Sequence, residues 1–244
     1  MTDVTSVARQ RGGRRNGLPR GSLTQERIVT ESLRLLDAGG LAGFSMPKLG
    51  QALGADPTAV YRHFASKDDL ILAIADRLIE EAMAGLMPSE CWVSTLIDTT
   101  RRLRRTYLAH PAAASLSAYR TTQRPAEMRI VDVLLEAVLA AGFEGAEAAV
   151  VYRAIGDFAL SWCGGEAAFL SLDERLQARD RAAWTQAYLA AGRDRYPHIW
   201  RVREELPQIT DDAIFEMILS IVITGIRQRA PRPCACETHR GHPG

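Results

Sequence analysis

The sequence predicts an all-α protein, and three of its features lead to this expectation. Apolar residues recur three and four positions apart along most of the chain, which is the period of a helix with one buried face. Runs of β-branched residues are few, and glycine and proline gather at the joints between periodic segments and at the chain ends. The chain has 244 residues, 47% of them hydrophobic, which is enough for two domains with cores of their own.

We expect four segments along the chain. An arginine-rich arm occupies residues 1–23, followed by a three-helix head at 24–86, a larger helical body at 87–230 and a proline-rich tail at 231–244. The arm and the tail lack an apolar pattern that could build a core, so both are expected to be disordered.

The head is expected to open with a helix over 24–39 and to continue with a short second helix. Ser45 precedes an apolar run and can cap this second helix, and Pro47 lies in its first turn, where a missing N–H costs little. Gly54 can adopt a positive φ and end the helix. These local features predict a tight joint directly after the second helix.

Another short helix is expected over 57–64. Asp56 can cap it, and Val60 and Phe64, four residues apart, should face the core. The remaining side chains are mostly hydrogen-bond donors, contain no acid, and lie near a helix N-terminus that attracts phosphate: Thr58, Ala59, Tyr61, Arg62 and His63. Two short helices with such a joint and such a face are typical of a helix–turn–helix that enters the major groove of DNA.

A longer helix over 66–85 is expected to connect the head to the body. Ser66 and Asp69 have the spacing of a capping box, and Lys67 between them is placed to reach a phosphate. An ordinary helical hairpin with a polar solvent face would show part of the same pattern. The preceding helix, the outer face without acids and the arginine-rich arm favour DNA binding over that alternative.

Residues 24–72 resemble the tetracycline-repressor (TetR) family of bacterial transcriptional regulators. The resemblance rests on TQERIVTESLRLLDAGG, LAGFSMPKLGQALG and AVYRHFASKDDLI, in which the Tyr61-x-His63-Phe64 element and Lys67 are a mark of the family. It implies that Ser45 and Lys48 meet the DNA backbone, that Thr58, Ala59, Tyr61 and His63 face the groove, and that Tyr61, His63 and Lys67 contact phosphates. Pro47 cannot donate a hydrogen bond, so any polar contact made from this position in other members is absent here.

The body is expected to contain helices at about 90–109, 111–120, 124–141, 145–170, 172–193 and 211–229, with an irregular connection around a short helix at 193–210. Those near 145–163 and 211–229 are apolar on more than one face, so each should be buried on several sides. They could pair with their copies in a four-helix bundle or form the core of a monomer. The resemblance implies the first arrangement, a homodimer.

Several polar and aromatic residues of the body could line a small-molecule pocket: Arg101, Arg102, Arg104, Arg105, Tyr107, His110, Tyr119, Tyr152 and Trp162. Taken singly, the arginines are more typical of a solvated face and the rings of a core. The sequence therefore identifies no ligand-binding residue, although the resemblance implies a small-molecule effector.

The sequence contains no motif of an enzyme, a cofactor site or a metal site that we would assign. Cys234-x-Cys236 with His239 and His242 is too tightly spaced, in a proline-rich tail, to predict a metal site. The four cysteines show no paired spacing, which favours a reduced, cytoplasmic protein. The N-terminus is too polar for a signal peptide, and the longest apolar stretch, about 213–226, is too short to span a membrane.

Charge is distributed unevenly although the net charge is only +1. The arm and residues 45–67 are basic, whereas the first helix and residues 68–90 are acidic, which would confine DNA to one face of the head. The sequence thus predicts a ligand-responsive regulator, a repressor that binds a near-palindromic operator in double-stranded DNA as a homodimer and is released by a small molecule. The alternatives are a helical enzyme with its active site in the body and a protein-interaction adaptor that docks through the hairpin.

Overall fold

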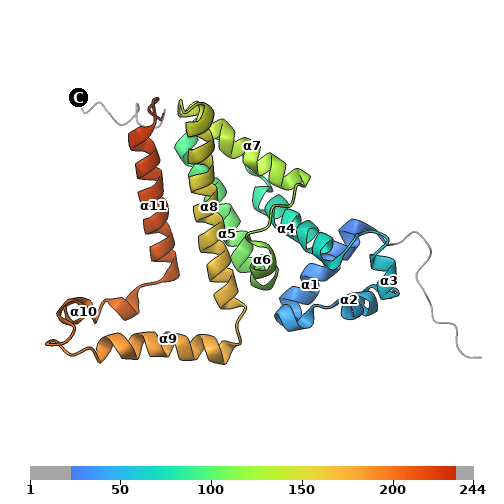
Figure 1. Cartoon of the computed structure of the whole chain (residues 1–244), viewed down its shortest axis with the longest axis horizontal. Helices are drawn as coiled ribbons and strands as arrows, with labels where there is room; N and C mark the ends of the chain where they lie inside the picture. Colours follow the sequence, from blue (N-terminus) through green and yellow to red (C-terminus); the bar gives the residue numbers. More distant parts are fainter. Residues whose placement is uncertain (1–22, 235–244) are drawn as a thin grey trace, which may run out of the picture.

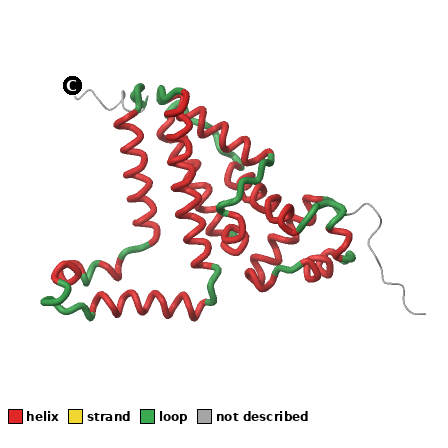
Figure 2. The backbone as a smooth tube through the Cα atoms, viewed as in Figure 1, coloured by secondary structure: helices red, strands yellow, loops and turns green. Residues whose placement is uncertain are grey.

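The computed structural model describes residues 23–234 and confirms the all-α prediction, since this part of the chain contains helices and no strand (Figures 1 and 2). The arginine-rich arm up to residue 22 lies outside the described residues. The elements are α1 (Gln25–Gly43), α2 (Met46–Leu53), α3 (Pro57–Val60), α4 (Lys67–Met83), α5 (Trp92–Ala109), α6 (Pro111–Ser117), α7 (Pro125–Ala140), α8 (Gly145–Leu170), α9 (Glu174–Leu189), α10 (Pro197–Val202), the 3₁₀ helix η1 (Leu206–Gln208) and α11 (Asp211–Arg229).

Helices α1 to α3 and the first turns of α4 form the head, at the right of Figure 1. The side chains that build its core are each at most 2% exposed: Ile28, Leu36, Leu49, Leu53, Val60, Phe64, Leu70 and Ile74. The inward orientation expected of Val60 and Phe64 is thereby confirmed. Helix α1 continues beyond the expected end at residue 39, but Gly40 has a φ of 58° and breaks its helical geometry there.

The joint between α2 and α3 depends on two glycines. Gly54 ends α2 in the left-handed region with a φ of 63°, as its position predicts. A Cβ at Gly50 would lie 3.0 Å from the carbonyl oxygen of Ala55 and from the nitrogen of Pro57. The two short helices can therefore approach this closely only because residue 50 has no side chain.

Helix α4 carries the head on one side and packs against α5, α6 and α7 of the body on the other. Helices α5 and α8 lie at the centre of the body, with α6 and α7 beside them. The predicted break around residues 87–89 is confirmed, because the chain is not helical between the end of α4 and the start of α5.

Helices α9 and α10 extend away from the C-terminal end of α8, and α11 returns beside α8 (Figure 1). In this single chain α11 buries one stripe, made by Phe215, Leu219, Ile223 and Ile226. Met217 and Ile221, on its other sides, are each 62% exposed. The expectation that this helix is buried on several sides is thus not met within one chain.

The cysteines differ from the expectation of a fully reduced protein. Cys91, just before α5, forms a disulfide with Cys234, and their Cα atoms are 5.6 Å apart. The pairing joins residues 143 positions apart, so no local spacing could reveal it. Cys163 is free and buried.

The segment 231–234 packs on the body, although the tail was expected to begin at residue 231. The backbone N–H of Arg232 donates to the carbonyl of Ala141 at 2.9 Å, and Cys234 is 1% exposed. The rest of the expected tail, including Cys236, His239 and His242, lies outside the described residues.

The arginine cluster of α5 is not the uniformly solvated face that was expected. Arg104 is 8% exposed, and its guanidinium donates to the two carboxylate oxygens of Glu166 at 2.8 and 2.6 Å. Asp212 lies 2.7 Å from the same guanidinium, which also stacks 4.5 Å from the ring centre of Phe215. The hydrogen bonds that Arg104 donates to Glu166 outweigh the opposing effect of burial, so they raise the pKa of Arg104 and keep it charged. One buried cation thus joins α5, α8 and α11.

Candidate nucleic-acid interface

Three side chains cap the starts of α2, α3 and α4, and all three were expected as caps. The Ser45 hydroxyl accepts from the N–H of Lys48 at 3.4 Å, and that of Ser66 accepts from the N–H of Asp69 at 3.0 Å. Asp56 accepts from the N–H of Thr58 at 2.8 Å and from its hydroxyl at 2.7 Å. These hydrogen bonds, the one from the Thr58 hydroxyl first, lower the pKa of Asp56.

Helix α3 ends at Val60, four residues earlier than predicted. The N–H of His63 donates to Val60 at 2.9 Å, an i→i+3 bond that tightens the chain after the helix. The side-chain amide of Gln25 donates to the carbonyl of His63 at 2.7 Å, so α1 occupies an acceptor that a longer helix would have used. Tyr61 and Arg62 therefore lie on a pinned turn instead of a helix.

The eight predicted DNA-binding residues all reach the surface of the head. Tyr61 is 48% exposed, Thr58 and Arg62 are exposed, and Ala59 and His63 are half-buried. The phenol, guanidinium and imidazole of consecutive residues thus lie outside the core, directly after the C-terminal end of α3.

The two lysines of the predicted set fold over the link between α1 and α2. Lys48 donates from Nζ to the carbonyl of Ala42 at 2.8 Å. The Nζ of Lys67 lies 5.5 Å from the ring centre of Phe44. The start of α2 and the start of α4 therefore meet at this link, and each has an exposed lysine there. Ser45, which caps α2 at the same place, is half-buried.

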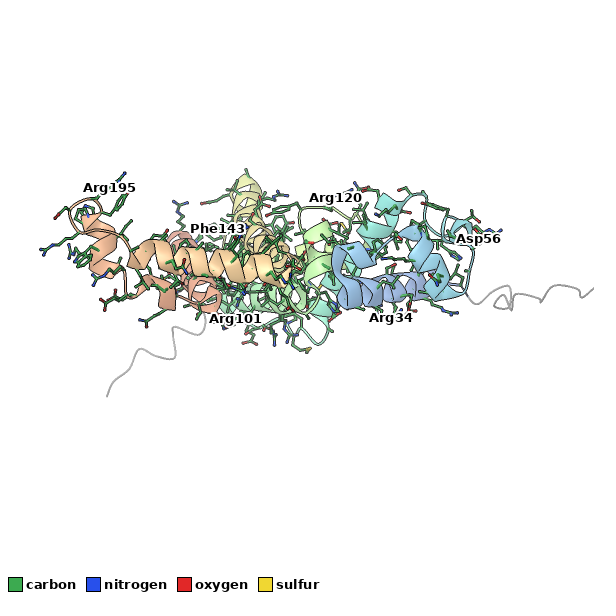
Figure 3. All side chains as sticks on the ribbon, turned by 90° about the horizontal axis from the view of Figure 1, so that it is seen from below. Arg34, Asp56, Arg101, Arg120, Phe143 and Arg195 are labelled. Atoms are coloured by element: carbon green, nitrogen blue, oxygen red, sulfur yellow. A yellow bond between two sulfur atoms is a disulfide. The ribbon has the colours of Figure 1, made fainter. Side chains whose placement is uncertain are left out.

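Sequence reasoning missed a contact by which the body holds the head. Arg120, after α6, donates to both carboxylate oxygens of Asp68 at 2.7 Å, and Arg124 donates to Asp69 at 2.6 Å. Figure 3 shows Arg120 at the junction of head and body. The hydrogen bond from Arg120 lowers the pKa of Asp68. We call these four residues the clamp. They fix the first turn of α4, which contains Lys67, to the segment between α6 and α7.

A second contact between head and body is centred on His110, between α5 and α6. Its Nδ1 lies 2.9 Å from a carboxylate oxygen of Asp37 in α1, and its Nε2 lies 3.3 Å from Glu81 in α4. Burial alone would lower the pKa of His110, but the hydrogen bond and charge of Asp37, together with Glu81, raise it overall.

This geometry predicts a pH-dependent contribution of His110 to stability. Because its pKa is raised on folding, the contribution is fully present below the unfolded pKa of about 6.5 and is lost as the pH rises through the folded pKa. His110→Asn is therefore expected to lower the free energy of unfolding more at about pH 5.5 than at about pH 8.5. Urea unfolding of both proteins at the two pH values measures this, and an equal difference at both would contradict it.

The body encloses a cavity between α4, α5, α6, α7 and α8, which we call the central cavity. Its free volume is about 90 Å³, and most of its lining is apolar. Of the residues considered from the sequence, Tyr107 and Tyr152 line it. Desolvation by burial raises the pKa of Tyr107, so its phenol is neutral. Arg101, Arg104 and Arg105 instead line a shallower pocket beside α11 (Arg101 is labelled in Figure 3).

No helix within residues 23–234 is long and apolar enough to cross a lipid bilayer. In the same range no group of three or more histidine, cysteine, aspartate or glutamate side chains is arranged to hold a metal ion.

A capped three-helix head with an exposed donor-rich face, carried on a larger helical body, defines a helix–turn–helix DNA-binding protein. Residues 28–74 match the family model described as bacterial regulatory proteins, tetR family, and residues 85–230 match that of the tetracyclin repressor-like C-terminal domain. The chain belongs to the TetR family, whose members are transcriptional regulators and not enzymes.

Individual relatives agree with this assignment. An HTH-type transcriptional regulator of Saccharopolyspora erythraea is 30% identical over 152 residues, which are 62% of this chain and 64% of that protein. ActR from Streptomyces coelicolor, solved with actinorhodin, superposes with a TM-score of 0.74 over 87% of this chain and 99% of its own, and at 23% identity this shows a shared fold alone. BioQ, solved with its double-stranded DNA operator, has a TM-score of 0.55 and 28% identity over 61% of this chain and 89% of its own.

Proposed function

We propose that this protein is a cytoplasmic, ligand-responsive transcriptional repressor, and not an enzyme. It binds a near-palindromic operator as a homodimer and is released by a small molecule in the central cavity. The observation that carries the proposal is the exposed turn of Tyr61, Arg62 and His63, pinned to α1 by the bond between Gln25 and His63. BioQ, which was solved on its operator, supports this use of the head.

The DNA-binding surface that we propose consists of side chains from three helix starts and one turn. The starts of α2 and α4 supply contacts to the backbone, and α3 with the turn behind it enters the major groove. Its members are Ser45, Lys48, Thr58, Ala59, Tyr61, Arg62, His63 and Lys67.

The proposed response to a small molecule acts through α4, which lines the central cavity and starts in the head. A ligand changes the spacing of two heads only as far as it binds one arrangement more tightly than the other. The clamp connects the body to the first turn of α4, and His110 connects it to α1. Through these contacts a ligand-dependent change in the body would alter the position of the head. ActR, which was solved with actinorhodin, supports a ligand site in this fold.

The proposed homodimer would cover the apolar side chains that one chain leaves exposed on α8 and α11. Val150 is 67% exposed, and Met217 and Ile221 are each 62% exposed. Pairing of α8 and α11 with their copies buries these positions in a four-helix bundle. Sedimentation at micromolar concentration is expected to give the mass of two chains, and a mass of one chain would contradict the dimer.

Selection of bound duplexes from a random pool tests the proposed function as a whole. The expected product is a near-palindrome with two half-sites about one helical turn apart. Recovery of no preferred sequence, with no change in binding as salt is raised, would instead support an adaptor that docks on protein.

A further prediction concerns the N-terminal arm, residues 1–23, and rests on the sequence alone. Residues 1–23 contain five arginines and one acid, so contact of this arm with phosphates would add to the salt-dependent part of binding. Deletion of residues 1–20 is expected to weaken operator binding and to flatten its dependence on salt concentration. Anisotropy titrations of both proteins with the selected duplex at several salt concentrations measure this, and an unchanged slope would refute it.

A further inference from the structure

The wall of the central cavity includes a buried hydroxyl that has no hydrogen-bond partner among the described residues. Thr99 lines the cavity, and its side-chain oxygen is buried and makes no hydrogen bond. Thr99 is 3% exposed, so bulk water does not satisfy it either. A buried hydroxyl without a partner is destabilising by about 1–3 kcal/mol. In the wall of a cavity, such a group indicates a ligand that forms the missing hydrogen bond.

The other aliphatic hydroxyls of the wall differ from that of Thr99 because they are bonded within their own helices. Thr100, the next residue of α5, donates to the carbonyl of Leu96 at 2.8 Å, and Ser117 donates to the carbonyl of Ala113 at 2.9 Å. Both hydroxyls also line the cavity, but each is bonded to its own helix. Thr99 is thus the aliphatic hydroxyl of the wall that is left to a bound molecule, in a wall that also contains the phenols of Tyr107 and Tyr152.

The charged groups of the wall are already bonded within the protein. Arg120 is bonded to Asp68 by two hydrogen bonds of 2.7 Å. Glu127 accepts from the hydroxyl of Thr122 at 2.8 Å and from the N–H of Gln123 at 2.7 Å. An anion placed among the remaining apolar side chains would have no free countercharge, because Arg120 is already paired with Asp68, and burial of an uncompensated charge is strongly unfavourable.

We infer that the effector is a largely apolar molecule without a negative charge that carries a hydroxyl or carbonyl group, and that this group bonds to the side chain of Thr99. The inference rests on the proposed function and adds the chemical class of the ligand. The apolar wall supplies most of the affinity by burial of the ligand surface, and the hydroxyl of Thr99 selects among molecules of equal shape.

Three flat probes of one skeleton test this inference on the full-length protein: 2-naphthol, naphthalene and naphthalene-2-carboxylate. Binding is measured by calorimetry at neutral pH, where the first two probes are uncharged and the third is an anion. We expect 2-naphthol to bind about five- to tenfold more tightly than naphthalene, which is the effect of one hydrogen bond, and the anion to bind most weakly.

Thr99→Val replaces the hydroxyl by a methyl group of the same shape and is the deciding variant. It is expected to bind 2-naphthol and naphthalene equally and to unfold at a higher temperature than the wild type, because an unsatisfied buried oxygen is removed. Thr100→Val is the matched control on the same helix, since the Thr100 hydroxyl is already bonded, and it should keep the preference for 2-naphthol.

Tighter binding of the anion, an unchanged preference in Thr99→Val, or no binding of either neutral probe up to its solubility limit would overturn the inference. Operator binding by the wild type is measured separately and tests the proposed function. If the protein preferred 2-naphthol over the other probes but bound no operator, the inferred ligand class would stand and the proposed function as a regulator would be overturned.

Discussion

Tyr61→Ala and Lys67→Ala are each expected to weaken operator binding by about tenfold or more while the head stays folded. Both side chains are exposed, and neither contributes to the core built by residues such as Val60 and Phe64. Loss of the cation at Lys67, which we propose contacts a phosphate, should also reduce the slope of log affinity against log salt by about one. Anisotropy titrations with the selected duplex at several salt concentrations measure both quantities.

Arg34→Ala is the matched control for the loss of one cation from the head. Arg34 is on α1 (labelled in Figure 3), its side chain is 60% exposed and pairs with Glu31, and it is not among the residues of the proposed interface. Its replacement should leave the salt slope unchanged. Circular dichroism and sedimentation verify that all three variants keep the helical content and assembly state of the wild type. Full retention of operator affinity in both Tyr61→Ala and Lys67→Ala would defeat the proposed interface.

Arg104→Ala is expected to lower the free energy of unfolding by about 3–5 kcal/mol, because it leaves a buried carboxylate without its partner. The side chains of Arg104 and Glu166 are only 10% and 9% exposed, so water cannot replace the lost guanidinium. The same change removes the cation stacked on Phe215 and the ion pair with Asp212, and leaves the Arg101–Glu216 pair as an ionic contact between α5 and α11. Urea unfolding at one fixed protein concentration measures the difference, since association also contributes to apparent stability.

Two further variants separate burial from the mere presence of an ion pair. Arg153 and Asp157 form a pair on α8 whose side chains are 66% and 54% exposed, so Arg153→Ala should cost at most about 0.5 kcal/mol. The double change Arg104→Met with Glu166→Leu should recover most of the lost stability, because it removes both charges together. A loss in Arg104→Ala no larger than in Arg153→Ala would show that the buried pair contributes little.

The head could be predicted well because its determinants are local. Ser45, Asp56 and Ser66 each bond an N–H two or three residues ahead, and Gly54 ends its helix by its own φ. Such information is contained in a few consecutive residues. The early end of α3 could not be predicted, because it involves the bond from Gln25, 38 residues away from His63.

In the body, the helices were predictable and their side-chain partners were not. The expected ranges 145–170 and 211–229 coincide with α8 and α11, since glycine and proline mark many of the ends. Arg104 belongs to a run of arginines that is typical of a solvated surface, yet its partner Glu166 lies 62 residues away. The Cys91–Cys234 bond and the clamp are equally remote in sequence. Only packing of the helices brings such groups together.

The disulfide has a topological consequence for any movement between head and body. Cys91 precedes α5 and Cys234 follows α11, so the bond turns helices α5 to α11 into a covalent ring. Within the described residues, α1 to α4 are joined covalently to this ring by one short segment, residues 84–90. A movement of α1 to α4 relative to the body can therefore bend the backbone at this one segment, while the length of the covalently closed chain from Cys91 to Cys234 does not change.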